Sequence, residues 1–122
     1  MTSPDPQVYL LHIRDRCEEL IQCRNLRQQG TVPASILFNA VCRNLEIIGE
    51  ASRKIGPEFR AANPEVPWRE MNALRNVLIH NYDGADPELV WAIVERDIRS
   101  WRRCAGWSEA RINSDAAYSD RR

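Results

Sequence analysis

Apolar side chains recur every three or four positions along most of the chain, which is the period of amphipathic α-helices. We predict four such helices, over about residues 6–29, 34–55, 68–80 and 87–104. Asp5-Pro6 and Asp86-Pro87 each supply a capping carboxylate followed by a proline, which is a typical helix start. Gly30 and Gly56-Pro57 supply the stop signals of the first two helices. The sequence has no strand-like alternation, so the pattern predicts an all-α fold.

The links between these helices complete the predicted architecture. Residues 57–67 contain three prolines and should form a packed connector with one helical turn at 58–62. The third helix should fail near His80, because turn-forming residues follow it. The long helices and short links predict an up-and-down four-helix bundle with one short extra helical turn. Residues 1–106 would form this domain, and residues 107–122, which lack periodicity and apolar mass, would form a flexible tail.

Composition agrees with an ordinary globular protein, since 43% of the 122 residues are hydrophobic and 28% are charged. No run of about 18 apolar residues is present, so no segment is expected to span a membrane. Residues 1–6 lack the basic and then apolar pattern of a secretory signal, so we expect a cytoplasmic protein. Four tryptophans are expected to pack in the core and at an interface: Trp68, Trp91, Trp101 and Trp107.

Charge and cysteine content narrow the function classes. The chain has 17 basic and 17 acidic residues, which argues against a protein that coats DNA through its overall charge. The four cysteines stand far apart and form no C-x-x-C pair, so we expect neither a disulfide framework nor a metal site. Cys17 falls on an apolar stripe and is predicted to be a small buried hydrophobe.

The two histidines call for different interpretations. His12 lies between Leu11 and Ile13 on the first helix, without a carboxylate or a second histidine at a helical spacing. A partly buried or surface histidine is the favoured interpretation there. His80 instead closes the third helix, five residues after Arg75, and precedes a Tyr-Asp-Gly turn.

Arg75 and His80 have the chemistry needed to cleave RNA. Positions five apart on an ideal helix differ by about 140° in direction, so a break after His80 would help the two side chains to meet. The negative end of a helix stabilises a protonated imidazole, which suits acid–base catalysis near neutral pH. Arg75 would stabilise charge on the phosphate, and the 2′-hydroxyl of RNA is a built-in nucleophile, so no metal or other cofactor is required. Spacing alone also fits a surface arginine and a capping histidine.

Four stretches in chain order together carry a family resemblance: Leu45–Ala51 with I-G-E-A, Val66-Pro67-Trp68, Leu74–Tyr82 with R-x4-H-x-Y, and Asp86–Trp91. They resemble the HEPN superfamily, and within it the HepT-like toxins that pair with a minimal nucleotidyltransferase antitoxin of the MntA type. The resemblance extends from about Val8 to Trp101. The fold that it implies is the HEPN-like helical bundle.

The resemblance implies a homodimer in which two copies of the motif line one cleft and form a metal-independent RNA endonuclease, the toxin of a toxin–antitoxin pair. Arg75 and His80 would be its catalytic residues, Asn76 a supporting polar group, and Glu50 a residue facing the cleft. Two His80 side chains across the two-fold axis would supply both a base and an acid. Tyr82 would be the hydroxyl to which the antitoxin adds AMP, placing an anion beside Arg75 and silencing the toxin.

An interpretation from a different class remains open. The chain would then be a non-catalytic helical subunit that binds a nucleotide and partners a minimal nucleotidyltransferase, with Arg75 and His80 as phosphate ligands. This alternative predicts that the purified, unmodified protein leaves RNA intact. No base-reading module is recognisable, so the sequence does not distinguish a tRNA from an mRNA substrate.

Overall fold

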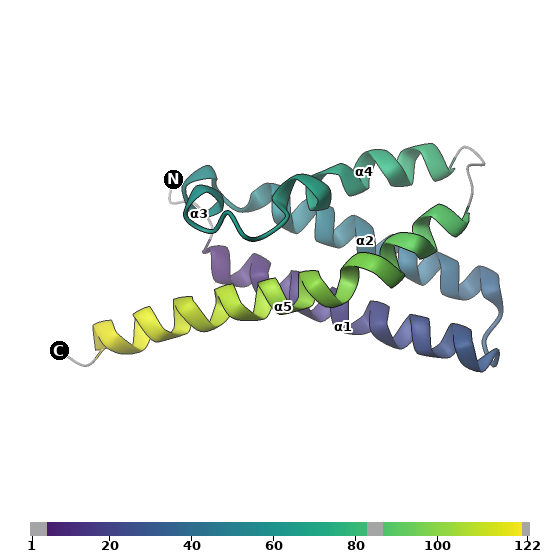
Figure 1. Cartoon of the computed structure of the whole chain (residues 1–122), viewed down its shortest axis with the longest axis horizontal. Coiled ribbons are helices and arrows are strands. Elements are labelled where there is room, and N and C mark those ends of the chain that lie inside the picture. The colour runs from purple at the N-terminus through teal and green to yellow at the C-terminus, as the bar shows by residue number, and fades with distance from the viewer. Residues whose placement is uncertain (1–4, 83–86, 121–122) are drawn as a thin grey trace.

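The computed structural model describes the backbone of residues 5–82 and 87–120 and the side chains of residues 5–79 and 87–104. Within these residues the elements are all helices: α1 (Pro6–Gln29), α2 (Ala34–Lys54), α3 (Pro57–Ala62), α4 (Trp68–Tyr82) and α5 (Pro87–Asp120) (Figure 1). The all-α fold predicted from the sequence is therefore confirmed, and α3 is the predicted extra turn.

The first two helices begin and end where the sequence predicts. The Asp5 carboxylate accepts a hydrogen bond of 3.0 Å from the backbone N–H of Gln7, and proline occupies the first position of α1. Gly30 ends α1 in the left-handed conformation, with φ of 70°, which glycine adopts without steric cost. Ile55 leaves the helical conformation after α2, two residues before Pro57.

The last two helices are longer than predicted. The third helix was expected to fail near His80, but α4 continues to Tyr82, because asparagine and tyrosine are tolerated in a final helical turn. The fourth was expected to end near Cys104, but α5 continues to Asp120. A single glycine at position 106 weakens a helix without breaking it, and no proline follows. The division into a domain and a flexible tail at residue 106 remains a prediction.

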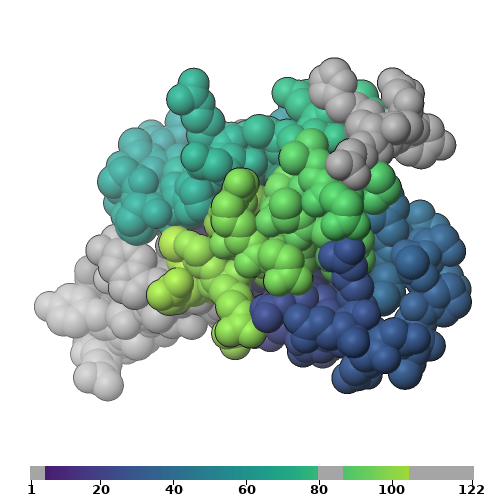
Figure 2. All heavy atoms as spheres, turned by 45° about the vertical axis from the view of Figure 1, so that its right-hand side comes forward, coloured from purple at the N-terminus to yellow at the C-terminus, as the bar shows by residue number. Residues whose placement is uncertain are grey.

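The helices pack in an up-and-down order in which α1 contacts α2 and α5, and α2 also contacts α4 (Figure 1). Three bridges between α1 and α5 show that these two helices are antiparallel, because higher numbers in α1 pair with lower numbers in α5: Glu18–Arg102, Arg24–Glu95 at 3.1 Å and Arg27–Glu88 at 2.9 Å. In the space-filling view, α5 covers the front of the bundle between α4 above and α1 below (Figure 2).

One apolar core runs through the bundle, with side chains from all four long helices. Cys17, Trp68, Trp91 and Trp101 are buried in it, as the sequence predicts, whereas the side chain of Trp107 lies outside the described residues. The indole N–H of Trp68 donates to the carbonyl of Asn63 at 2.9 Å, which ties the connector to the start of α4. No helix in the described part of the chain is long and apolar enough to cross a membrane.

Candidate active site

Helix α4, which carries the R-x4-H-x-Y motif, has a buried side and an outer side. Met71 and Leu74 are buried, and Val77 and Leu78 are partly buried against the core. The polar positions of the motif helix lie on the other side, where Arg75 is exposed. The same side carries Ala73, Asn76 and Ile79, which are also exposed. The apolar period of α4 therefore turns the polar residues of the motif away from the core.

The continuation of α4 to Tyr82 changes how the motif is arranged. The helix break predicted after His80 is wrong, so positions 75 and 80 are about 140° apart around one continuous helix. Position 76 lies between them, about 40° from position 80, and position 82 returns to within about 20° of position 75. The side chains of His80 and Tyr82 lie outside the described residues. One chain thus spreads Arg75, Asn76 and His80 around the outer side of α4.

Gly49 in α2 determines how closely α4 approaches. A Cβ atom at this position would lie 3.4 Å from the carbonyl oxygen of Met71 and 3.6 Å from the Cβ of Leu74. A side chain larger than a methyl group would therefore keep the backbones of the two helices apart one turn before Arg75. The neighbouring residue of α2, Glu50, is placed beside Arg75 as a result.

A cavity of about 730 Å³ lies on the outer side of α4, next to α2 and α3. We call it the arginine cavity, and its lining residues are Arg53, Arg60, Asn72, Arg75, Asn76 and Ile79. The side chains of Arg60 and Arg75 have no ion pair or hydrogen bond with another described residue, and the side chain of Arg53 has a single ion pair of 3.8 Å with Glu50. Its described lining contains no carboxylate, so the cavity offers guanidinium groups to an anion.

A second hollow, the α2–α4 groove, has a volume of about 560 Å³. It is lined by Phe38, Asn39, Cys42, Arg43, Glu46, Glu50, Arg75, Leu78 and Ile79. Arg75 and Ile79 line both hollows, so Arg75 stands where the groove meets the arginine cavity. Burial raises the pKa of the Cys42 thiol above its ordinary value, which makes Cys42 a poor nucleophile near neutral pH.

The structure brings together several of the residues singled out in the sequence. Arg75 and Asn76 share the arginine cavity, and Arg75 and Glu50 share the α2–α4 groove. His12 is exposed, with its ring edge-on to that of Tyr9 at 6.1 Å, and does not line either hollow. Among the described residues, no group of three His, Cys, Asp or Glu side chains is placed to hold a metal ion.

Three further polar residues at this site were missed by the sequence analysis: Arg53, Arg60 and Asn72. Arg53 and Arg60 flank the Gly56-Pro57 break, and no local spacing relates them to the motif. Asn72 was the one with a detectable signal, because it stands three positions before Arg75 and therefore on the same side of α4.

The sequence of the chain is similar to a known protein family and to several named proteins. Residues 10–105 match the family described as Ribonuclease HepT-like. The chain is 40% identical over 99 residues to the candidate RNase MJ1380 of Methanocaldococcus jannaschii, covering 80% of this chain and 91% of that protein. It is 37% identical over 94 residues to the candidate RNase TTE0752 of Caldanaerobacter subterraneus, covering 76% of this chain and 84% of that protein.

A third relative matches over a shorter stretch. The probable ribonuclease HepT of Thermococcus cleftensis is 52% identical over 61 residues, which is 50% of this chain and 56% of that protein. No solved structure matches the chain. The predicted family and the predicted enzyme class, an endoribonuclease, are confirmed by the family match and these relatives. The chain therefore belongs to the HepT-like ribonuclease family.

Proposed function

We propose that this ribonuclease is the toxin of a toxin–antitoxin pair and cleaves RNA internally, without a metal ion, through Arg75 and His80. The observation that carries the proposal is the state of Arg75. Its guanidinium is exposed, has no anionic partner among the described residues, and lines a cavity with Asn76 on the side of α4 that faces away from the core. An unpaired guanidinium in this position is suited to bind a phosphate oxygen.

The proposed reaction uses the 2′-hydroxyl of the RNA as the nucleophile. A base removes the proton of this hydroxyl while its oxygen attacks the adjacent phosphorus. The bond from phosphorus to the 5′-oxygen of the next nucleotide breaks, and an acid protonates that leaving oxygen. The products are a 2′,3′-cyclic phosphate and a 5′-hydroxyl end. Arg75 stabilises the additional negative charge on the phosphoryl oxygens in the transition state, and His80 transfers the protons.

A homodimer makes this mechanism complete. One chain supplies a single motif histidine, whereas the reaction benefits from a base and an acid at the same time. Positions 75 and 80 also lie about 140° apart on α4, so the groups are better combined from two helices than within one. A two-fold axis beside α4 would bring both copies of Arg75 and His80 to one cleft, with Asn76 and Glu50 supporting them.

Regulation is proposed to act through Tyr82, to which an MntA-like nucleotidyltransferase antitoxin would transfer AMP. Positions 75 and 82 differ by about 20° around α4 and by about 10.5 Å along it, so they share one side of the helix. An AMP group on Tyr82 would therefore extend along the side that carries Arg75. Its phosphate would compete with RNA for the guanidinium, which inhibits cleavage without refolding.

The arginine cavity also suits a second candidate function. The phosphate of a bound nucleotide would satisfy Arg60 and Arg75 as well as an RNA phosphate does. In that case the chain would be a non-catalytic nucleotide-binding subunit of a nucleotidyltransferase complex. The two functions make opposite predictions for the protein purified alone.

The deciding experiment incubates unmodified protein with tRNA and mRNA in the presence of EDTA. We expect cleavage with 2′,3′-cyclic phosphate ends, and a loss of at least about a hundredfold in rate for Arg75→Ala and for His80→Ala. Arg69→Ala is the matched control, because Arg69 is also an exposed, unpaired arginine of α4 but lines neither hollow. Intact RNA with the wild-type protein, together with tight AMP binding, would instead establish the nucleotide-binding function. Tyr82→Phe should cleave RNA but escape inhibition by the partner enzyme.

A further inference from the structure

The described arginines fall into two groups. Most of them pair with a carboxylate, but the side chains of five have no ion pair or hydrogen bond with another described residue: Arg60, Arg69, Arg75, Arg99 and Arg103. Since the chain carries equal numbers of acidic and basic residues, unpaired arginines gathered in one place are not a consequence of overall charge. Arg60 and Arg75 line the arginine cavity, and Arg99 and Arg103 line a second groove between α1 and α5.

The arginine cavity is built from three separate elements. Arg53 comes from the last turn of α2, Arg60 from α3, and Asn72 and Arg75 from α4. The Nε atom of Arg60 is buried and has no hydrogen-bond partner, although a buried donor is normally satisfied. Arg53 contacts Glu50 at 3.8 Å, a long ion pair between half-exposed side chains that a ligand can replace at little cost.

Asn72 is held at the arginine cavity by a contact with α2. The buried hydroxyl of Ser52 donates to the Oδ1 atom of Asn72 at 2.8 Å. The same hydroxyl, which has a single proton, also lies 2.9 Å from the carbonyl oxygen of Gly49, so the contact fixes the place of Asn72 at the cavity. Two guanidinium groups and one amide, from Arg53, Arg60 and Asn72, therefore surround a space that also reaches Arg75.

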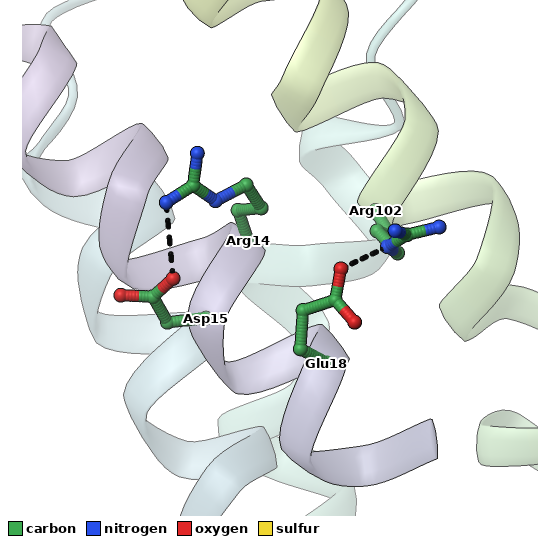
Figure 3. Close-up of polar contacts among 4 residues, drawn as sticks. All are labelled: Arg14, Asp15, Glu18 and Arg102. Carbon is green, nitrogen blue, oxygen red and sulfur yellow. Dashed lines mark hydrogen bonds and ion pairs between the residues drawn. The ribbon is translucent and has the colours of Figure 1, made fainter. Parts of the chain in front are cut away.

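A second groove with several arginines lies between α1 and α5 and is lined by Arg14, Glu18, Ile21, Arg99, Arg102 and Arg103. Two of its arginines are neutralised, since Arg102 bridges to Glu18 and Arg14 pairs with Asp15 at 3.3 Å (Figure 3). Arg102 and Glu18 come from different helices, so this pair also joins α1 to α5. A carboxylate in the lining makes the α1–α5 groove less suited to a phosphate than the arginine cavity.

We propose that Arg53, Arg60 and Asn72 form a second phosphate subsite, which binds the RNA phosphate adjacent to the one that Arg75 holds for cleavage. The proposal rests on the proposed function, because it takes the phosphate on Arg75 to be the scissile one. Neighbouring phosphates of one strand need neighbouring cationic sites, and the arginine cavity is continuous with Arg75. The contacts involve the backbone of the RNA and not its bases, so they set the register of the strand without selecting its sequence.

The first test measures binding of a 2′-O-methyl RNA, which cannot be cut, as a function of salt. Arg53→Ala and Arg60→Ala should each weaken binding on the order of tenfold and should make the slope of log K against log salt shallower by about one. Arg69→Ala should leave the affinity almost unchanged. Affinities and slopes equal to those of the wild-type protein for both cavity variants would refute the subsite. This measurement needs no cleavage, so it decides the subsite even where the nuclease proposal fails.

The second test locates the phosphate. The substrate is a DNA oligonucleotide with a single ribonucleotide, which defines the scissile linkage, and each neighbouring linkage in turn is made an uncharged methylphosphonate. At one linkage next to the cut, we expect the methylphosphonate to lower the kcat/KM of the wild-type enzyme about tenfold. The Arg53→Ala, Arg60→Ala double variant should lose nothing further at that linkage. An equal loss in both enzymes at every linkage would overturn the proposal.

Conservative variants separate binding from folding. Arg53→Lys and Arg60→Lys keep the charge but lose the planar fork, so they should recover part of the affinity and most of the salt slope. Thermal unfolding of each variant, compared with that of Arg69→Ala, reports any damage to α3. A variant that loses affinity but keeps both its melting temperature and its helical circular dichroism supports the subsite. Recovery of affinity by lysine is not expected from a role in folding alone.

Discussion

Replacement of Gly49 tests whether the close crossing of α2 and α4 positions Arg75. An alanine Cβ would meet the Met71 carbonyl oxygen at 3.4 Å and the Leu74 Cβ at 3.6 Å, which are ordinary contact distances. Gly49→Ala should therefore fit with little movement, and alanine is favoured over glycine inside a helix by about 0.8–1 kcal/mol. We expect the Gly49→Ala protein to be as stable as the wild type or up to about 1 kcal/mol more stable.

Gly49→Leu extends the perturbation by three further carbon atoms, for which the contact with α4 leaves no room. Overpacking of this kind costs about 1–3 kcal/mol, and the gain in helix propensity of about 0.8 kcal/mol offsets part of it. The two helices must then move apart. Arg75 directly follows Leu74 on α4, so its position relative to Glu50 and to the arginine cavity should change. A displacement of about 1 Å is enough to lower the cleavage rate about a hundredfold.

Urea unfolding followed by circular dichroism, and RNA cleavage by the same preparations, measure the two effects. We expect normal stability and activity for Gly49→Ala, and reduced stability with a larger loss of activity for Gly49→Leu. The reasoning fails if Gly49→Ala is destabilised by more than about 2 kcal/mol, since the distances leave room for a methyl group. It fails equally if Gly49→Leu retains wild-type stability and activity.

Four further predictions concern the scaffold. Burial raises the pKa of the Cys17 thiol from 9.0 to about 12. Cys17 should therefore resist alkylation at pH 8 until urea unfolds the protein. Rapid labelling of the folded protein would contradict this prediction. Because the folded pKa is the higher one, this contribution to stability is complete below pH 9 and is lost as the pH rises toward 12, which urea titrations at several pH values can follow. Asp5→Ala should lower the free energy of unfolding by about 1 kcal/mol through loss of the α1 cap, and Asp5→Asn should restore it. Arg27→Ala should lower the free energy of unfolding by about 1 kcal/mol or less, because the contacts of Arg27 with Glu88 and Trp91 are partly solvent-exposed. A larger loss would indicate an unrecognised packing role for Arg27.

Strong local signals in the sequence, such as capping residues and a glycine stop, predicted the helix ends correctly. Asp5-Pro6 and Gly30 define α1 because a cap and a left-handed glycine act within a few residues of chain. The ends of α4 and α5 were placed too early, because turn formers and a lone glycine lower helix propensity only modestly. Such weak signals do not locate a helix end to within a few residues.

Some residues of the candidate site were predicted from local sequence, and others were not. Arg75 and Asn76 were recognised from one contiguous motif, and the motif helix shows them on its outer side as its apolar period requires. Arg53 and Arg60 were not recognised, because they join Arg75 only through the packing of α2, α3 and α4. Contacts between residues distant in the chain leave no regular spacing in the sequence.

The sequence by itself determined the family and the helical class, and it singled out Arg75 and His80 as the candidate catalytic residues, because motif, capping and hydrophobic period are local properties of the chain. Only the tertiary structure decided that α4 is one continuous helix, with positions 75 and 80 about 140° apart. Only the tertiary structure also placed Gly49 against Met71, and gathered the arginines of three elements around one cavity. These features depend on distances between elements, which packing sets and no single segment encodes.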